Sequence, residues 1–241
     1  MMRKLFAGAA LFVASGLAVS AGEWTGQVTP YVWAAGVGGD ITPFTGAPSL
    51  SFDKSASEIL EDVDGAFFLS GYARRDRLVL MGDLSWSSSS KAGAIPPGLP
   101  AEAKLKQRSL TLLAGWRAVT NEEMSLDLLA GLRAWKIKGS VDIAGGMLSA
   151  SPNKDFVDPL VAIRANFKLA DKWSSIFYVD YGGFGSGSDS TSQILATVNY
   201  QANDNLWLSA GYRQLNVDYR SGGTKFDVSM AGPLLGATWR F

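Results

Sequence analysis

The sequence contains neither cysteine nor histidine. Without cysteine, no disulfide can stabilise the fold, so stability must come from backbone hydrogen bonds. Without histidine, the chain lacks the usual general base at neutral pH and the commonest metal ligand in proteins. An excess of one charge sign is also missing, because 22 basic residues balance 22 acidic ones, and this argues against a nucleic-acid partner. We therefore expect no catalytic residue, no cofactor and no metal site.

Long apolar runs are missing too. The apolar run from Leu5 to Val19 is shorter than the roughly 20 residues that a membrane helix needs, and no later run is long enough. This run follows Arg3 and Lys4 and ends at a small-residue cleavage site, as in a secretory signal peptide. We expect residues 1–21 to be a signal peptide cleaved near Ala21, and residues 22–241 to form one domain.

Most of the chain alternates between apolar and polar residues with a period of two, which is typical of strands with two different faces. Segments of about ten residues suit tilted membrane strands. We predict ten such strands, with eight or twelve as alternatives, at residues 24–34, 65–75, 78–88, 105–118, 125–138, 156–169, 173–182, 192–202, 205–217 and 226–241. Short turns alternate with longer connections, and segment 53–63 of the first long connection has the pattern of a short amphipathic helix.

The aromatic residues indicate which face of the barrel is outside. Aromatic residues share the apolar face of the strands near the short turns: Trp24, Trp116, Phe167, Trp173, Tyr200, Trp239 and Phe241. A second group lies on the same face nearer the long connections: Trp86, Tyr181 and Tyr212. Two aromatic girdles are typical of two membrane interfaces. From Trp173 to Tyr181 the rise is about 21 Å at roughly 3.4 Å per residue and a tilt near 40°, close to the expected apolar band of about 25 Å. The pattern favours an all-β, transmembrane, antiparallel up-and-down β-barrel over a soluble barrel with an apolar interior.

An aromatic residue, Phe241, ends the last alternating segment. Four further segments are characteristic in sequence: 158–159, 180–189, 211–219 and 232–233. In these features the chain resembles a widespread family of small proteobacterial outer-membrane β-barrel proteins. The resemblance implies an outer-membrane location and assembly by the barrel-assembly machinery, and it implies no activity and no site residues. The outer-membrane phospholipase, the lipid A deacylases and the omptin proteases rely on an active-site histidine, so this chain fits none of them.

Charged residues occur on the face that points into the predicted barrel. We predict a lumen charge network of Asp83, Arg133, Asp158, Arg164, Asp180 and Arg213. The whole inward face carries four acidic residues, Asp83, Asp127, Asp158 and Asp180, and seven basic ones, Arg74, Arg117, Arg133, Arg164, Lys168, Arg213 and Arg240. Because basic residues outnumber acidic ones on this face, one hypothesis is a narrow, mildly anion-selective passive pore. The other is a polar plug, which we favour because side chains fill the interior of eight-stranded barrels and a ten-stranded barrel is only slightly wider. Segment 182–190 is rich in glycine, but a strand follows it rather than a helix, so we expect a flexible surface loop and not a phosphate-binding loop.

Five basic residues lie on the predicted lipid-facing side of one hairpin: Lys104, Lys106, Arg108, Lys136 and Lys138. If Trp116 pairs with Leu126, like charges face each other across the hairpin, which is unfavourable unless an anion lies between them. We therefore hypothesise that these cations, with no acid between them, bind lipopolysaccharide phosphates. The alternative is that the hairpin extends into water.

The favoured function is a monomeric, non-catalytic, structural or lipid-contacting outer-membrane barrel with a largely plugged lumen. Its expected partners are outer-membrane lipids, including lipopolysaccharide, and the assembly machinery. The alternatives are a narrow passive pore for small solutes and an adhesin that acts through its extracellular loops.

Overall fold

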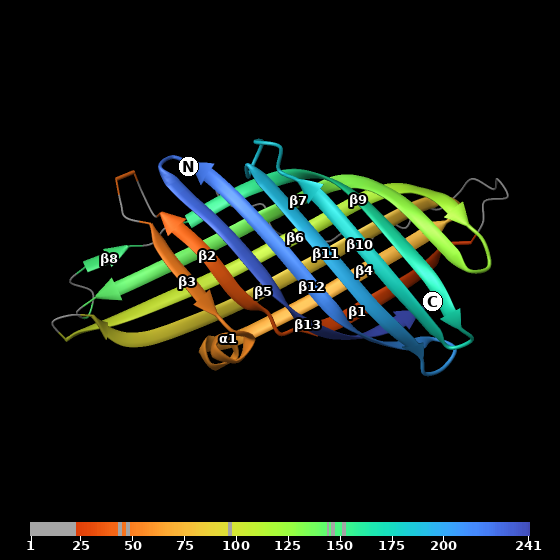
Figure 1. The fold of residues 1–241 in the computed structure, drawn as a ribbon, viewed down its shortest axis with the longest axis horizontal. Coiled ribbons are helices and arrows are strands. Elements are labelled where there is room, and N and C mark those ends of the chain that lie inside the picture. Colours follow the sequence, from red (N-terminus) through yellow and green to blue (C-terminus); the bar gives the residue numbers. More distant parts are fainter. Residues whose placement is uncertain are drawn as a thin grey trace.

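The computed structural model describes residues 23–42, 45–46, 49–95, 98–143, 145, 148–150 and 153–241. The predicted signal peptide at residues 1–21 lies outside the described residues. The barrel wall consists of β1 (Thr25–Trp33), β4 (Val63–Arg75), β5 (Leu78–Ile95), β6 (Leu99–Thr120), β7 (Met124–Ile143), β9 (Asn153–Ala170), β10 (Trp173–Gly182), β11 (Ser190–Gln201), β12 (Leu206–Ser221) and β13 (Thr224–Arg240). Short elements at the long-loop end are β2 (Gly36–Thr42), β3 (Leu50–Lys54), α1 (Ala56–Asp62) and β8 (Leu148–Ala150) (Figure 1).

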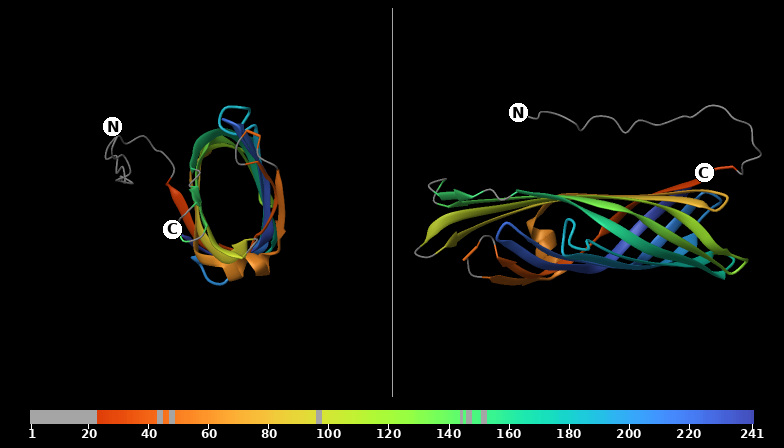
Figure 2. Two further views of the ribbon diagram at one scale, coloured as in Figure 1. Left: turned by 90° about the vertical axis from the view of Figure 1, so that its left-hand side faces the viewer. Right: turned by 90° about the horizontal axis from the view of Figure 1, so that it is seen from above.

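The ten wall strands pair in an antiparallel ring, because each strand pairs with its neighbour along the wall and β1 pairs with both β4 and β13. Seen end-on, the wall is a closed oval (Figure 2). The prediction of a ten-stranded antiparallel barrel is therefore confirmed. Among the described residues, no helix is long and apolar enough to cross a membrane.

The end of the chain closes the ring beside its first strand. The backbone N–H of Gly26 donates to the carbonyl oxygen of Phe241 (2.8 Å), and the N–H of Phe241 donates to the carbonyl oxygen of Gly26 (2.9 Å). The Phe241 ring lies over Gly26, where a Cβ atom would stand only 2.5 Å from Cε2 of the ring. A side chain at position 26 would therefore displace the Phe241 ring from this contact.

The outer face of the wall is apolar, as the alternation predicts. Aromatic side chains at the short-turn end are exposed on this face: Trp24, Trp116, Trp173, Trp239 and Phe241. Tyr181 and Tyr212 are exposed nearer the long loops. Trp86 is only half-buried, and its ring covers the position where a side chain of Gly65 would stand. Large apolar side chains that face outward are favourable only in contact with lipid or another apolar surface.

Several strands are longer than predicted. β5 and β6 continue to Ile95 and Leu99, so most of the segment expected to be a loop at residues 89–104 is a paired hairpin. This segment is rich in serine, glycine and proline, and this is why its sequence resembled a loop. In β12 and β13, Leu215, Val217 and Phe226 point inward and are buried. Above the outer aromatic residues, the wall is thus polar outside and apolar inside.

The predicted short helix is present as α1. Its N-cap is Ser55, whose side chain accepts from the backbone N–H of Glu58, while the Glu58 carboxylate accepts from the backbone N–H of Ser55 (2.8 Å). This reciprocal capping box satisfies two backbone donors at the start of the helix. The two hydrogen bonds from Ser55 hold the pKa of Glu58 below its ordinary value.

Candidate functional site

Charged and tyrosine side chains from opposite sides of the wall meet in the short-turn half of the lumen. We call this group the lumen plug, and it consists of Tyr31, Tyr72, Asp83, Arg117, Asp127, Arg133, Arg164, Tyr178, Asp180 and Arg213. The lumen plug contains three carboxylates and four guanidinium groups, and each carboxylate forms an ion pair with at least one guanidinium group. This pairing reduces the large cost of burying charge away from water.

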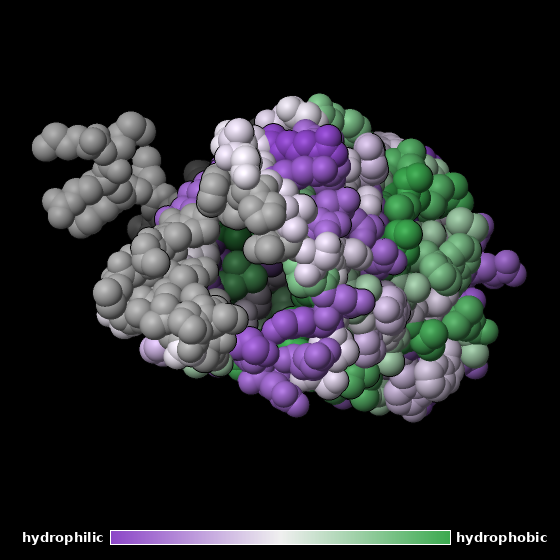
Figure 3. Space-filling model, turned by 60° about the vertical axis from the view of Figure 1, so that its left-hand side comes forward, coloured by the Kyte–Doolittle hydropathy of each residue, from purple (hydrophilic) through white to green (hydrophobic). Residues whose placement is uncertain are grey.

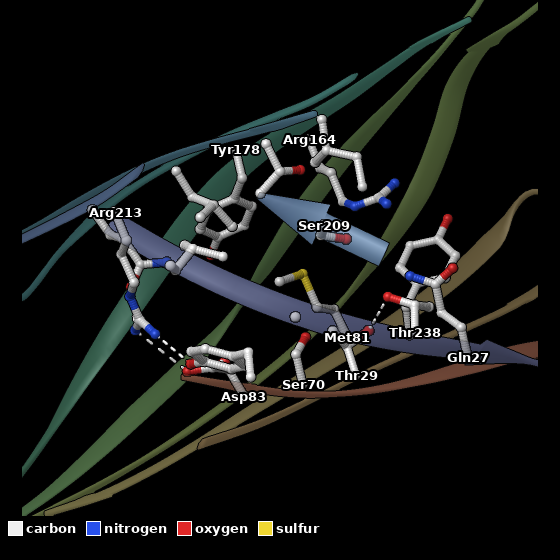
Figure 4. A pocket seen from close by; sticks show the side chains of 18 of the residues that line it. Gln27, Thr29, Ser70, Met81, Asp83, Arg164, Tyr178, Ser209, Arg213 and Thr238 are labelled. Atoms are coloured by element: carbon white, nitrogen blue, oxygen red, sulfur yellow. Dashed lines mark hydrogen bonds and ion pairs between the residues drawn. The ribbon is translucent and has the colours of Figure 1, made fainter. Parts of the chain in front are cut away.

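The first cluster of the lumen plug joins β5 to β12 across the lumen. Arg213 donates from Nη2 to Oδ1 of Asp83 (3.3 Å) and to the side-chain oxygen of Gln193 (2.7 Å). Tyr31 on β1 donates its hydroxyl to Oδ2 of Asp83 (2.8 Å) and accepts from Nη1 of Arg213. Figure 4 shows the Arg213 side chain pointing toward Asp83. The guanidinium also lies 4.6 Å from the ring centroid of Trp33, within the range of a cation–π contact.

The second cluster is the most deeply buried one. Arg133 on β7 donates from Nη1 to Oδ1 of Asp180 (3.1 Å) and from Nη2 to Oδ2 (2.5 Å). Its Nε and Nη1 also donate to the hydroxyl groups of Thr111 (3.0 Å) and Thr191 (3.3 Å). Tyr178 donates a further bond to Asp180 (2.7 Å). A bidentate pair of this kind has strict geometry as well as high energy, so it fixes the positions of β7 and β10.

The third cluster surrounds Asp127 near the short turns. Arg117 donates from Nε to Oδ1 of Asp127 (2.8 Å), and Arg164 donates from Nη1 to Oδ2 (3.4 Å). Tyr72 donates its hydroxyl to the same carboxylate (2.9 Å) and accepts from Nη2 of Arg117 (2.6 Å). The predicted network omitted Asp127, Arg117 and Tyr72, although their inward parity was visible in the sequence.

Asp158 does not join the charge network that we predicted for it. Among the described residues, no cation lies within ion-pair distance of its fully buried carboxylate. It accepts instead from the indole N–H of Trp135 (3.1 Å) and the backbone N–H of Ser188 (2.6 Å). Arg133 is its neighbour across the strands, but that guanidinium is used by Asp180.

The consequence of the Asp158 contacts is an anchored loop. Ser188 is buried and is fixed by Asp158, and the backbone N–H of Ser186 donates to the carbonyl oxygen of Gly183 (2.8 Å). The segment at residues 182–190 is a surface loop, as expected, but the buried carboxylate of Asp158 anchors it at Ser188.

Little space remains between the clusters. The cavity at the centre of the lumen plug has a volume of ≈ 100 Å³. Its lining is polar on several sides, and it includes the hydroxyl groups of Thr29 and Thr238, which lie 2.8 Å apart on the neighbouring strands β1 and β13 (Figure 4). Among the described residues, no group of three acidic side chains could hold a metal ion. The arrangement of side chains favours closure of the lumen at this level.

A larger cavity of ≈ 480 Å³ lies above the lumen plug, and sequence reasoning missed it. We call it the apolar cavity. Its lining includes Phe68, Trp135, Leu215, Val217 and Phe226. Figure 3 shows the hollow at the long-loop end, with hydrophobic side chains inside it. The available signal was the switch of parity in the predicted ninth strand, where apolar residues move to odd positions from Leu215 onward.

The basic residues on the outer wall differ from the prediction in two respects. Trp116 pairs with Leu128 and not with Leu126, because a bulge between Arg117 and Val119 shifts the hairpin register. Lys106 consequently faces Lys138, and Arg108 faces Lys136.

Acidic side chains also lie among these cations, contrary to the prediction. Lys104 pairs with Glu102 (2.9 Å), and Lys136 pairs with Asp155 (3.1 Å). The Glu102 carboxylate raises the pKa of Lys104. In the described part of the chain, no carboxylate lies within ion-pair distance of the remaining three cations, Lys106, Arg108 and Lys138.

Comparison with solved structures identifies outer-membrane β-barrels. The outer membrane protease OmpT from Escherichia coli has a TM-score of 0.61 and 11% sequence identity, over 93% of this chain and 99% of that chain. The translocator domain of the autotransporter NalP from Neisseria meningitidis has a TM-score of 0.50 and 13% identity, over 91% of this chain and 89% of that chain. No protein-family model and no curated protein matches the sequence. The chain therefore has the fold of an outer-membrane β-barrel.

Proposed function

We propose that this protein is an integral barrel of the outer membrane with a structural, non-catalytic role, and that the lumen plug closes it to ions and solutes. The observation that carries this proposal is the set of three buried ion-pair clusters in the lumen. The apolar outer face with its exposed aromatic residues supports membrane insertion.

The directions of the ion pairs support closure. Asp83 and Arg213 join strands that are separated along the wall by β13, β1 and β4, so their bond crosses the lumen. The bond from Tyr72 to Asp127 likewise joins β4 to β7 past two intervening strands. A hydrated ion would have to break these contacts to pass, and breaking a buried pair is costly.

Release of solute from liposomes tests this proposal. Liposomes that contain wild-type protein should retain chloride and glucose as well as protein-free liposomes do. A variant with Tyr31→Ala and Arg213→Ala should release chloride faster, because it removes the cluster that crosses the lumen. Arg220→Ala is the matched control, because this arginine is exposed and its ion pairs lie outside the lumen plug. Rapid release by the wild type would overturn the proposal, and release of chloride faster than potassium would favour the narrow anion-selective pore instead.

We propose a second element of this role, contact with anionic outer-leaflet lipid at Lys106, Arg108 and Lys138. Their freedom from carboxylate partners supports it, as does the pairing of Arg108 with Trp86 of the predicted outer aromatic girdle. Arginine and lysine both bind phosphate oxygens well.

Thermal unfolding with and without lipopolysaccharide tests this element. Lipopolysaccharide should raise the midpoint of the wild type, because a ligand that binds only the folded state stabilises it. Replacement of Lys106, Arg108 and Lys138 by Gln should reduce that increase. Replacement of Arg75 and Lys172 by Gln, at the short-turn end, should leave it unchanged. An equal increase of the unfolding midpoint in all three proteins would show that these cations are solvent-exposed residues of the hairpin that do not bind the lipid.

A further inference from the structure

The barrel wall has a gap at its long-loop end. β1 pairs with β4 up to Tyr31, but its continuation β2 pairs with β13 and β3 and leaves β4. Among the described residues, β3 has no strand partner on its other side, and β5 has none on that side beyond Ser89. Two strand edges therefore face a space that α1 occupies, and Figure 1 shows α1 in that part of the wall.

The helix in this gap is held mainly by charge. None of the residues of α1 is buried. Asp62 at its end accepts hydrogen bonds from Lys54 on β3 (2.8 Å) and Lys91 on β5 (3.1 Å), one from each side of the gap. An element with few buried apolar contacts belongs to the low-stability end of a structure, so it can move to admit a ligand.

The apolar cavity lies directly behind α1, and the gap and the cavity share lining residues. Ile59 and Leu60 of α1, Phe52 of β3, and both lysines contribute to the lining. Three lining residues leave large apolar areas uncovered: Leu60 is 60% exposed, Leu105 is 47% exposed and Ile41 is 36% exposed. Outer-membrane barrels normally have a polar lumen, and a concave apolar surface exposed to water marks a binding site.

The floor and the rim of the cavity differ in character. The lumen plug lies beneath it, so the cavity is blind toward the short-turn end. At the rim, the ammonium groups of Lys54 and Lys91 both bind the carboxylate of Asp62. The Glu58 carboxylate of α1 also lies near enough to interact electrostatically with both lysines, so the two positive charges face two negative ones. Each ammonium group has three donors, and Asp62 uses one of each, so donors remain for a second anion.

We propose that the apolar cavity binds a single-chain amphiphile with an anionic head group, of the class of long-chain alkyl carboxylates. The chain occupies the cavity, and the carboxylate lies between Lys54 and Lys91. The ligand enters from the extracellular side through the gap beside α1. The volume of ≈ 480 Å³ is at the smaller end of the usual range of about 300–1,000 Å³ for small-molecule pockets. It suits one chain and not the several chains of a lipid A molecule. This site is additional to the structural role proposed above.

Protection of an engineered thiol from a maleimide reagent tests the site. The natural chain has no cysteine, so a single introduced thiol is the sole target. Gln107 lines the cavity and is half-buried, and Gln107→Cys places a thiol there. Ser87→Cys is a second lining position in case the first variant does not fold. Ser186→Cys, in an exposed part of the anchored loop, is the control for effects of the amphiphile on the reagent or the membrane.

The probe is laurate, added to protein in nanodiscs. At a laurate concentration ten times above Kd, the unoccupied fraction is about one in eleven, so labelling of Gln107→Cys should slow about tenfold. Labelling of Ser186→Cys should not change. Unchanged labelling at both lining positions, or equal slowing at the control position, would overturn the proposal. Protection by lipopolysaccharide in the absence of protection by laurate would show that the single-chain assignment is wrong.

Charge variants test the assignment of the head group. The double change Lys54→Gln and Lys91→Gln should weaken laurate binding about threefold to tenfold, the range expected for the loss of a charged hydrogen-bonding partner near a surface. The corresponding alcohol, dodecanol, should bind both proteins equally. The matched control Lys104→Gln and Lys136→Gln removes two lysines that are also paired with carboxylates, but on the outer wall. If this control loses as much affinity as the rim variant, the rim lysines do not bind the carboxylate and the proposal fails.

Discussion

Removal of Arg133 from the lumen plug should be one of the most damaging single substitutions in this barrel. The Arg133 and Asp180 side chains are 2% and 0% exposed, so the pair is shielded from bulk water. In Arg133→Met, the Asp180 carboxylate keeps only the Tyr178 hydroxyl as a donor among the contacts described above. Breaking a buried pair by removing one partner costs about 3–5 kcal/mol of the free energy of unfolding. Asp180→Leu should cost a similar amount, because the guanidinium keeps only the two threonine hydroxyl groups.

The double variant should be far more stable than the sum of the single effects suggests. Replacement of a whole buried ion pair by apolar residues of similar volume is often neutral or even stabilising. We therefore expect replacement of the pair in Arg133→Met with Asp180→Leu to change the free energy of unfolding by about 1 kcal/mol or less. Loss of the acceptor for the Tyr178 hydroxyl should cost roughly 1–3 kcal/mol more. Urea unfolding in detergent micelles, followed by tryptophan fluorescence, measures all four proteins. A double variant that loses the full sum of about 6–10 kcal/mol would refute the reasoning, because the two side chains would then act independently.

Three further changes should have specific effects. Gly26→Val should lower the free energy of unfolding by about 1–3 kcal/mol because its side chain overlaps the Phe241 ring, whereas Gly71→Ala, where a Cβ meets nothing within 4 Å, should be nearly neutral; urea midpoints compare the two. Asp158→Ala should leave two buried N–H donors without an acceptor, so the loop that it anchors should become a site of proteolysis while wild type resists the same protease. Hydrogen bonds from two lysines hold the pKa of Asp62 below its ordinary value, so the docking of α1 should be stable above about pH 4 and be lost as pH falls through the lowered pKa. Pepsin should therefore cut α1 of the wild type only at low pH. The variant Asp62→Asn should be cut at every pH at which pepsin is active.

Local alternation was enough to predict the barrel. Each membrane-level strand must present apolar side chains to lipid on one face and polar or small ones to the lumen on the other, so the period of two was readable in β10, from Trp173 to Tyr181, and in β13, from Pro233 to Trp239. The turns between strands carried a second signal. Both are properties of short segments and need no knowledge of distant contacts.

The upper half could not be predicted in the same way. Above the outer aromatic residues, the pattern inverts at Leu215 in β12. In the membrane position proposed above, this is the level at which the surroundings of the wall change from lipid to water. The alternation of residues alone does not reveal which face of a strand points into the lumen when the outer face can contact either lipid or water. The apolar cavity depends on this inversion in several strands at once, so it appears only when β7, β12 and β13 are placed together.

The pairing of charges also depended on distant contacts. Inward parity identified Arg133, Arg164 and Arg213 as lumen residues, but their partners lie on strands distant in sequence. Asp158 was misassigned because its neighbour Arg133 turns toward Asp180 instead. The register at Trp116 was wrong because a single bulge, which has no clear sequence signal here, shifts the hairpin.

Single-channel recording in planar bilayers shows whether the lumen is closed. Refolded wild-type protein should give no stable openings, because the lumen plug leaves a cavity of only ≈ 100 Å³ at its level. The variant with Tyr31→Ala and Arg213→Ala should give small, resolvable openings under the same conditions. A large and stable conductance of the wild-type protein would contradict the account, because ions would then pass through a region that the ion pairs are held to close.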